Sequence, residues 1–378
     1  ELAFTATIDV LENDGLQVKS ILKQADTEVY DLFANRDSEL TWSFDVRSHY
    51  LTGRGKFNQT LAKDTMVDLR LEEIDIYSLF SRADQGESDP VSPSVFPSMQ
   101  ISADKLHWKD WHLRDVEIDT SWHKHGMLIN SLTLSGPAME FDARGTWLTS
   151  WRGVHETVLQ GELTGYNCGE TLIGLGYQMS LDRCDYEAEF NAKWPAEPYR
   201  MSWEIMKGTA RFDLTDGIIT DVDPGAGGRL IGLLNIFKLA NRLALDFDDV
   251  TKSGFAFDSI EGGFEFVDGK GSLNNVNLAA PAADMNVFGR IGLIEQDYNL
   301  LLRVKPHTDS LTFAGGALLG GVTVGAGLAL IKKVFDLGGA GHDVYSITGT
   351  WDKPVFEQVV QAGNSGDNSG GDFDDDDF

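Results

Sequence analysis

Hydrophobic and polar residues alternate along most of the chain, which places every second side chain on the same face of a β-strand. Residues 184–194 show this most clearly: Cys, Tyr, Ala, Phe, Ala and Trp occupy the even positions, and Asp, Glu, Glu, Asn and Lys occupy the odd ones. Residues 1–10 alternate in the same way, and similar segments recur as far as Trp351. The pattern predicts an antiparallel β-sheet with one apolar face and one face in contact with water.

An internal repeat indicates how these strands are organised. Residues 129–145 align without a gap on residues 273–289. In each copy a strand is followed by a Pro-Ala turn and by a second strand that closes on a glycine, Gly145 or Gly289. A sheet made of repeated hairpins grows along one axis. We therefore expect a mainly β fold, an elongated and curled antiparallel repeat sheet; the alternative is two chance hairpins with similar turns.

Two segments near the C-terminal end break the alternation, and we predict a helix in each. Near 228–243 the apolar residues recur at helical spacing. Near 313–336 lies a glycine-rich apolar stretch, without a charged side chain from Ser310 to Ile331. That stretch is long enough to span a bilayer, but its six glycines disfavour a helix. A membrane span, a helix packed into the protein and a helix lying at a membrane surface all stay open.

The two predicted helices supply candidate membrane contacts. The apolar candidates are Leu230, Leu233, Leu234, Phe237, Leu318, Leu319, Leu328 and Ile331. Arg229, Lys238 and Arg242 form a local basic group and are candidate ligands for phosphate head groups. The alternative role of the first helix is a lid that closes the end of the sheet on its apolar face.

Charge restricts the partners of the chain. With 59 acidic and 31 basic residues the formal net charge is -28 at pH 7, so we expect no nucleic-acid partner. Any membrane contact should be local and apolar. Residues 362–378 have almost nothing to bury and are predicted to form a disordered acidic tail. We divide the rest into upstream β repeats (1–96), a β repeat (97–205) and a C-terminal β repeat that carries both helices (206–361).

The sequence offers little to support catalysis. We find no nucleophile with its base, no carboxylate pair and no cluster of metal ligands; His123 and His125 are better explained as a surface pair. The expectation is a protein that is not an enzyme, without a cofactor or a metal. Cys168 and Cys184 could form a disulfide in an oxidising compartment, or be two small core residues in a reducing one.

Several motifs in the C-terminal half occur together. They are the Asp223-Pro224-Gly225 turn, Gly232-Leu233-Leu234-Asn235, Leu245-Asp246-Phe247, Phe257-Asp258-x-Ile260-x-Gly262 and Tyr345-x-Ile347-Thr348-Gly349-x-Trp351. In combination they resemble the C-terminal part of the YhdP branch of the AsmA-like family. The resemblance is dense from about 130 to 357 and weak before 97. It implies a long β-sheet that crosses the periplasm of the Gram-negative cell envelope, with an inner-membrane anchor at an N-terminus that this chain lacks.

The resemblance also implies a function, non-enzymatic transport of phospholipid between the inner and outer membranes. This chain would then be the end nearest the outer membrane, with phospholipids and that membrane's surface as partners. A curled sheet with one apolar face would form a groove in which acyl chains escape water. The alternative is an extended structural or scaffold protein of the envelope with a closed, dry β core. The candidate groove residues are Phe4, Ile8, Trp42, Phe44, Phe141, Tyr186, Phe190, Phe255, Phe257, Leu300 and Leu302.

Overall fold

A computed structural model describes five stretches of the chain: residues 2–78, 92–174, 181–219, 255–307 and 343–359. Within them, residues 11–15, 25–26, 38–39, 59–64, 77, 109–110, 137, 282 and 352 are not described. The predicted helices near 228–243 and 313–336, with their candidate membrane-contact and head-group residues, lie outside the described residues. So does the predicted acidic tail.

The alternating segments form strands. Their bounds are β1 (Leu2–Val10), β2 (Leu16–Gln24), β3 (Thr27–Arg36), β4 (Thr41–Ser48), β5 (Leu51–Asn58), β6 (Met66–Asp75), β7 (Ser98–Trp108), β8 (Trp111–His123), β9 (Gly126–Gly136), β10 (Met139–Thr149), β11 (His155–Gly165), β12 (Leu181–Asp182), β13 (Asp185–Trp194), β14 (Lys207–Ile219), β15 (Phe255–Val267), β16 (Lys270–Ala279), β17 (Ala283–Gly292), β18 (Asp297–Pro306), β19 (Asp343–Thr350) and β20 (Pro354–Gln358).

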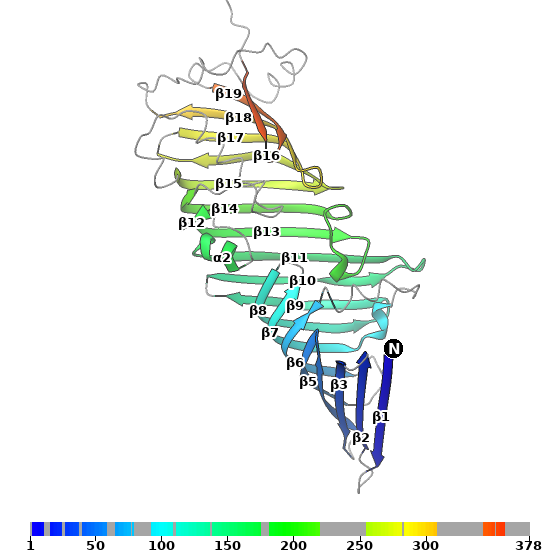
Figure 1. Ribbon diagram of the computed structural model, residues 1–378. Helices are drawn as coiled ribbons and strands as arrows, with labels where there is room; N and C mark the ends of the chain where they lie inside the picture. Colours follow the sequence, from blue (N-terminus) through cyan, green and yellow to red (C-terminus); the bar gives the residue numbers. More distant parts are fainter. Residues whose placement is uncertain are drawn as a thin grey trace, which may run out of the picture.

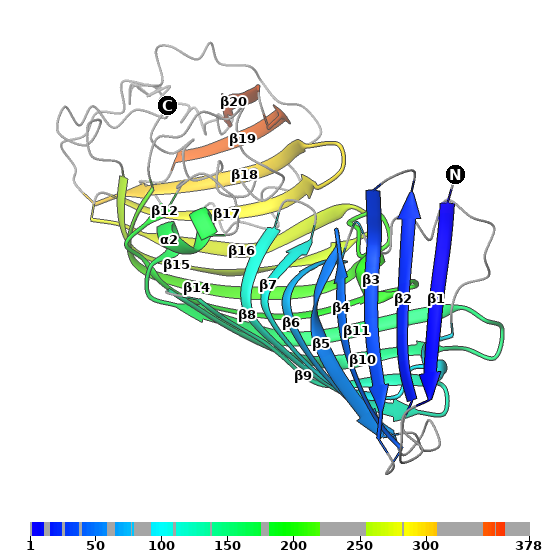
Figure 2. The same cartoon turned by 60° about the horizontal axis from the view of Figure 1, so that its bottom comes forward.

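The described strands belong to one sheet of 20 strands, so the mainly β prediction is confirmed. Apart from β6 and β7, successive strands pair antiparallel along the chain; β11 pairs directly with β13, and the short β12 adds to β14. Within the described residues the sheet does not close, because its end strands β1 and β20 each have one neighbour, β2 and β19. Figures 1 and 2 show a long sheet that twists and bends along its length.

One pairing departs from the predicted antiparallel order. Strands β6 and β7 run parallel, with Met66 opposite Ser98 and Asp75 opposite His107. Parallel neighbours need a connection that runs back along the strands, so that the second strand begins at the same end as the first. The segment that begins after Asp75 and ends before Ser98 makes this return, and its described end includes a short 3-10 helix, η3 (Pro93–Val95).

The sequence repeat corresponds to a repeat in strand register. In the β9–β10 hairpin Leu134 lies opposite Phe141, and in the β16–β17 hairpin Leu278 lies opposite Met285 at the equivalent position. Both hairpins also contain a register shift, which lies within two residues of Gly145 or Gly289 on the second strand. Two chance hairpins would not be expected to share an irregularity, so the repeat explanation is favoured.

Burial is uneven along the sheet. The largest buried cluster occupies the C-terminal half, where Ile260, Leu278 and Leu300 are each 1% exposed. A smaller cluster joins β6, β7 and β8 around Leu71 and Val116. Outside these clusters the apolar side chains of the N-terminal half are mostly half-buried. One α-helix with described ends, α2 (Cys168–Gly174), lies between the two halves and was not predicted.

Candidate functional site

The strand register aligns apolar residues into one row that crosses the sheet, which we call the central row. Each member is the Cα partner of the next, and every member is apolar or glycine. The central row consists of Ile8, Val18, Ala34, Phe44, Gly55, Leu69, Ile101, Ile118, Leu132, Ala143, Gly161, Phe190, Ala210, Phe264, Leu273, Gly289, Leu300 and Ile347. Since Cα partners share a face, these residues lie on a single apolar face from β1 to β19.

A second row beside the central row is also apolar. It runs from Val46 through Gly53, Leu71, Ala103, Val116, Leu134, Phe141, Leu163, Ala188 and Phe212. Two adjacent apolar rows make the face wider than a single line of contacts. The apolar face is therefore a continuous strip across many strands. The alternation of residues within one strand shows only which side chains of that strand belong to it.

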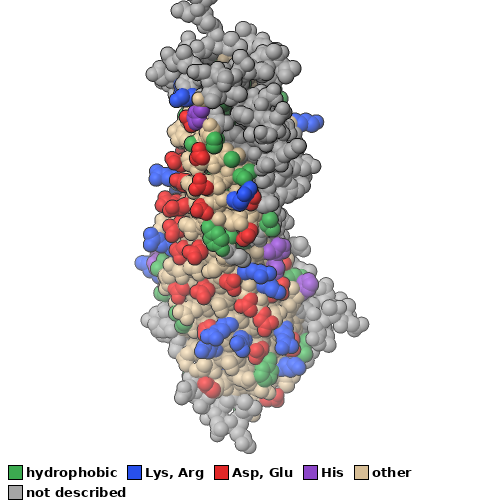
Figure 3. Space-filling model, turned by 90° about the vertical axis from the view of Figure 1, so that its left-hand side faces the viewer, with side chains coloured by type: hydrophobic (Ala, Val, Ile, Leu, Met, Phe, Trp, Pro, Cys, Tyr) green, Lys and Arg blue, Asp and Glu red, His purple; other side chains and the backbone are tan. Residues whose placement is uncertain are grey.

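The opposite face is charged. Along β13 the side chains between the apolar ones, including Glu187, Glu189 and Lys193, are exposed. On β5 and β6 the ammonium of Lys56 lies 3.8 Å from a carboxylate oxygen of Asp68. Figure 3 shows a side of the molecule covered by acidic and basic side chains with few hydrophobic ones. One side of the sheet therefore suits water, and the other suits apolar material.

Exposure of the apolar face changes along the sheet. From β4 to β14, several large side chains, among them Phe44, Phe141 and Phe190, are only half-buried. From β16 to β19 the corresponding side chains are closed off from solvent, with Leu302 1% and Ile347 0% exposed, whereas Phe264 on β15 is still half-buried. Accessible apolar surface of this kind is a feature of binding sites. The N-terminal half of the face is thus the candidate binding surface.

The structure places the predicted groove residues in three environments. Trp42, Phe44, Phe141, Tyr186 and Phe190 are half-buried on the apolar face, and Ile8 on β1 is 66% exposed. Phe257, Leu300 and Leu302 lie in the closed part at 1–2% exposure. Phe4 and Phe255 belong to β1 and β15, and their side chains are not described. Their role in lipid contact stays a prediction.

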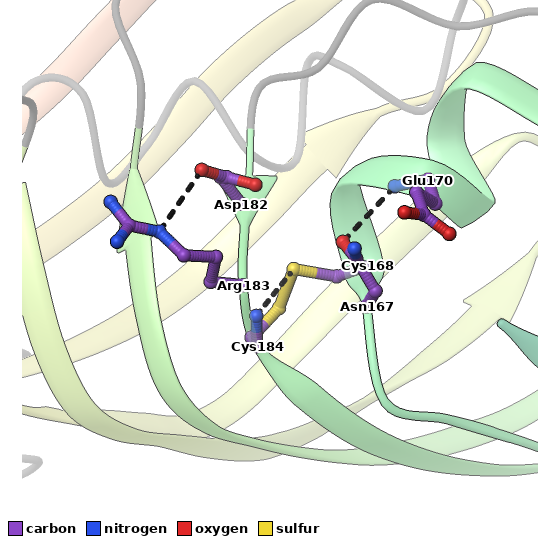
Figure 4. Close-up of polar contacts among 6 residues, drawn as sticks. All are labelled: Asn167, Cys168, Glu170, Asp182, Arg183 and Cys184. Atoms are coloured by element: carbon purple, nitrogen blue, oxygen red, sulfur yellow. Dashed lines mark hydrogen bonds and ion pairs between the residues drawn. A yellow bond between two sulfur atoms is a disulfide. The ribbon is translucent and has the colours of Figure 1, made fainter.

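A disulfide fixes α2 on the apolar face. Cys168 at the start of α2 is bonded to Cys184, just before β13, and both residues are buried within the large core cluster. The Cys168 amide also donates to the Cys184 carbonyl at 3.0 Å. Figure 4 shows this link together with the Asn167 side chain, whose Oδ1 accepts from the Glu170 amide at 3.2 Å. The disulfide alternative for the two cysteines is the one that the structure contains.

A second set of contacts holds the middle of α2. The hydroxyls of Thr171 and Tyr186 lie 2.7 Å apart, and the Tyr186 hydroxyl donates to the Ala138 carbonyl at 3.3 Å. Burial raises the pKa of Tyr186, and the hydrogen bond from Thr171 partly offsets the rise. The phenol therefore stays neutral at physiological pH, and α2 rests on β13 through uncharged groups.

Two features of this surface escaped the sequence reasoning. Arg36 lies on the apolar face, because it is the partner of Trp42, and its guanidinium carbon is 5.8 Å from the Trp42 ring centroid. Helix α2 does carry a local signal, an Asn three residues before a Glu at the helix start, which is a capping pattern. No local sequence signal marks Arg36, because only the register between strands shows which face this residue occupies.

No group of three or more potential metal ligands occurs among the described residues. His107 makes close polar contacts, with Nδ1 2.6 Å from Nδ1 of His112 and Nε2 2.8 Å from a Glu73 oxygen, but these side chains belong to no such group. Within the described parts of the chain, no helix is long and apolar enough to cross a membrane.

Comparison with known proteins identifies the family. A family model described as YhdP protein matches residues 21–356, most of the chain. The chain belongs to the YhdP family. A curated protein named intermembrane phospholipid transporter YhdP, from Escherichia coli (strain K12), is 24% identical over 296 residues. The match covers 73% of this chain and 23% of the relative, so the chain spans about a quarter of that YhdP protein. No solved structure matches the chain.

Proposed function

We propose that this chain is part of a non-enzymatic conduit that moves phospholipid between the inner and outer membranes of a cell envelope. In this proposal the curled sheet forms a groove, acyl chains lie against its apolar face, and head groups stay at the rims in water. The observation that carries the proposal is the central row, which crosses the sheet without a polar side chain. The name of the E. coli relative supplies the cargo class, phospholipid.

The energetics of the apolar face suit an acyl chain. Burying a methylene contributes about 0.8 kcal/mol, so a chain of about 16 carbons gains on the order of 10 kcal/mol when it leaves water. Adjacent strands lie roughly 4.8 Å apart, so the half-exposed part from β4 to β14 is roughly 40 Å long. That length exceeds the roughly 15 Å depth of one leaflet of a bilayer, half of the hydrocarbon core. More than one lipid can therefore lie along it.

The disulfide supports the proposed location. Disulfides persist in oxidising compartments such as the bacterial periplasm and are rare in the cytosol. A buried Cys168–Cys184 bond fits a chain that folds in the periplasm. We further propose that this part of the protein lies at the end nearest the outer membrane, and that an inner-membrane anchor belongs to the longer protein.

The closed part of the sheet favours a second candidate, an extended structural or scaffold protein with a dry β core. Leu273, Val287, Leu300 and Ile347 are at most 4% exposed, as in an ordinary core. The half-exposed face from β4 to β14 argues against a dry core along the whole chain.

Lipid analysis of the chain purified without detergent separates the two candidates. We expect phospholipid at reproducible stoichiometry in organic extracts and in native mass spectra. Phe190→Asp should remove it, because a carboxylate in the middle of the apolar face is costly to bury. Asn191→Asp is the matched control, since it adds the same charge at the next position on the exposed face. A folded, lipid-free wild-type chain, or equal loss in both variants, would contradict the conduit.

A further inference from the structure

The apolar face is covered from one rim at the boundary between its accessible and closed parts. Helix α2 lies beside the start of β13 (Figure 1), bonded through Cys168–Cys184 and resting on Tyr186. Leu172 of α2 packs against the large core cluster. The row that contains Tyr186 continues through Leu214 and Ile260, so α2 covers the rim at which the closed part of the face begins.

The other rim is covered at the same strand. Residues 195–206 connect the end of β13 to β14 and include the 3-10 helix η4 (Pro198–Arg200). The Trp194 indole donates to the Glu197 carbonyl at 2.9 Å, and the Thr157 hydroxyl donates to the Ala196 carbonyl at 2.7 Å. The Trp203 ring meets the Phe266 ring edge-on at 5.8 Å. These contacts fold the connection back onto the apolar face.

Between the two covers remains a strip at the middle of β13. Its residues are Ala188 and Phe190, both half-buried, with Gly161 on β11 and Ala210 on β14 as the neighbours of Phe190. The strand partners of Phe190 are small, so the centre of the strip carries its ring, stacked on that of Phe141 with centroids 5.8 Å apart, while both rims are occupied. Any acyl chain that passes from the accessible part to the closed part has to cross this strip.

We propose that α2 and residues 195–206 form a waist in the lipid path, and that the Cys168–Cys184 disulfide holds the waist narrow. This inference rests on the proposed lipid function. The two covers differ in how they are held: residues 195–206 are held by hydrogen bonds and aromatic packing alone, whereas the contacts of α2 include a covalent bond, Cys168–Cys184. Removing the disulfide therefore loosens one side of the waist and leaves the other in place.

The test uses photo-crosslinking on both sides of the waist. The full chain carries p-benzoylphenylalanine in place of Phe141, before the waist, or Phe264 on β15, beyond it. Each protein is incubated with vesicles of phosphatidylethanolamine and phosphatidylglycerol and then irradiated. With the disulfide intact we expect lipid adducts at 141 and few at 264. In Cys168→Ser/Cys184→Ser the adducts at 264 should rise by at least about fivefold, the lower end of typical coupling between sites.

A second variant leaves the disulfide in place. Ala188→Phe fills the strip, so adducts at 264 should fall further while those at 141 persist; circular dichroism confirms that each variant is folded. Equal adducts at 264 in the wild type and in both variants would overturn the waist while leaving the lipid function intact. An absence of adducts at 141 in every protein would overturn the proposed function, and the waist with it.

Discussion

Phe141 of β10 and Phe190 of β13 stack with ring centroids 5.8 Å apart and planes 14° apart. Strand β11 lies between them, and Gly161 is the β11 partner of Phe190. Since Gly161 has no side chain at this position, the Phe190 ring can reach across β11 to the Phe141 ring. The apolar face therefore owes part of its shape to contacts that skip a strand.

The stack should contribute a measurable coupling energy. Phe141→Ala and Phe190→Ala should each lower the free energy of unfolding. The decrease in the double variant should be smaller than the sum of the two single decreases. Stacked aromatic pairs are coupled by about 0.5–1.5 kcal/mol beyond the apolar area that they bury. Urea denaturation of the four proteins in the cycle measures this coupling. Phe141→Ala with Phe57→Ala on distant β5 is the control pair and should be additive; an equally additive Phe141/Phe190 pair would contradict the stack.

The disulfide should stabilise the fold as well as position α2. It closes a loop with a sequence separation of 16 residues. A loop of about this length contributes about 3 kcal/mol through the entropy of the unfolded chain. Cys168→Ser/Cys184→Ser should lower the free energy of unfolding by about that amount in a urea titration without reductant. Asp182→Ser, which removes an exposed contact to Arg183, is the control and should change stability by less than about 1 kcal/mol.

Two glycines at equivalent positions of the repeat should resist substitution. A Cβ at Gly289 would lie 2.4 Å from the Asn299 carbonyl oxygen, and Gly289 has a φ of 121°. A Cβ at Gly145 would collide with the Val158 carbonyl. We expect Gly145→Ala and Gly289→Ala each to destabilise by about 1–3 kcal/mol, the usual cost of overpacking. Gly136→Ala should be nearly neutral in thermal melts, because its nearest new neighbour is 3.8 Å away. Equal effects at all three sites would show that the close approach is not the cause.

The fold class and the apolar face were largely predictable from the sequence, because period-two alternation is a local property of each strand. Strand order between β6 and β7 was not, since their parallel pairing depends on where a connection crosses the sheet. The polarity of β13 predicted that Tyr186 and Phe190 share a face. It did not indicate that Leu300 and Leu302 would be buried while Phe190 is half-exposed, because burial depends on what other segments cover.

The candidate site, too, was predictable from the sequence in part only. Alternation marked the aromatic members of the apolar face, yet the central row depends on register, which hairpin turns and register shifts set strand by strand. The waist combines α2 and residues 195–206, two connections whose positions follow from tertiary contacts. The boundaries at 96/97 and 205/206 stay predictions, since one continuous sheet runs through both regions.

Acid should weaken the β17–β18 hairpin through Asp297. Its carboxylate accepts two hydrogen bonds from Arg290, at 2.9 and 2.7 Å, and the Arg290 hydrogen bond is the main reason that the pKa of Asp297 is lowered. A lowered carboxyl pKa contributes stability above the unfolded value of about 3.9, and this contribution is lost as pH falls through the folded value. Both side chains are about one-third exposed, so solvent limits the effect to about 1 kcal/mol or less.

Urea midpoints measured from neutral pH down to about pH 3, where the unfolded carboxyl protonates, test this contribution. Asp297→Asn should be less stable than the wild type at neutral pH, and the difference should shrink in acid. Asp268→Asn is a control, since Asp268 makes a single contact to Lys207 at 3.2 Å with both side chains more exposed. A difference at Asp297 that does not change with pH would rule out the charge as its source.

His307, at the end of β18, should titrate above the usual range for histidine. Its Nε2 lies 3.1 Å from an Asp284 oxygen, and this hydrogen bond is the main reason that the pKa of His307 is raised; the Pro281 carbonyl adds to the effect. A raised histidine pKa contributes stability below the unfolded value of about 6.5, and this contribution is lost as pH rises through the folded value.

NMR titration of the imidazole resonances measures the pKa of His307 directly. Asp284→Asn should bring the pKa back towards 6.5, and Lys305→Gln should raise it, because the Lys305 charge opposes protonation. A His307 pKa that Asp284→Asn leaves unchanged would show that the ion pair does not form in solution.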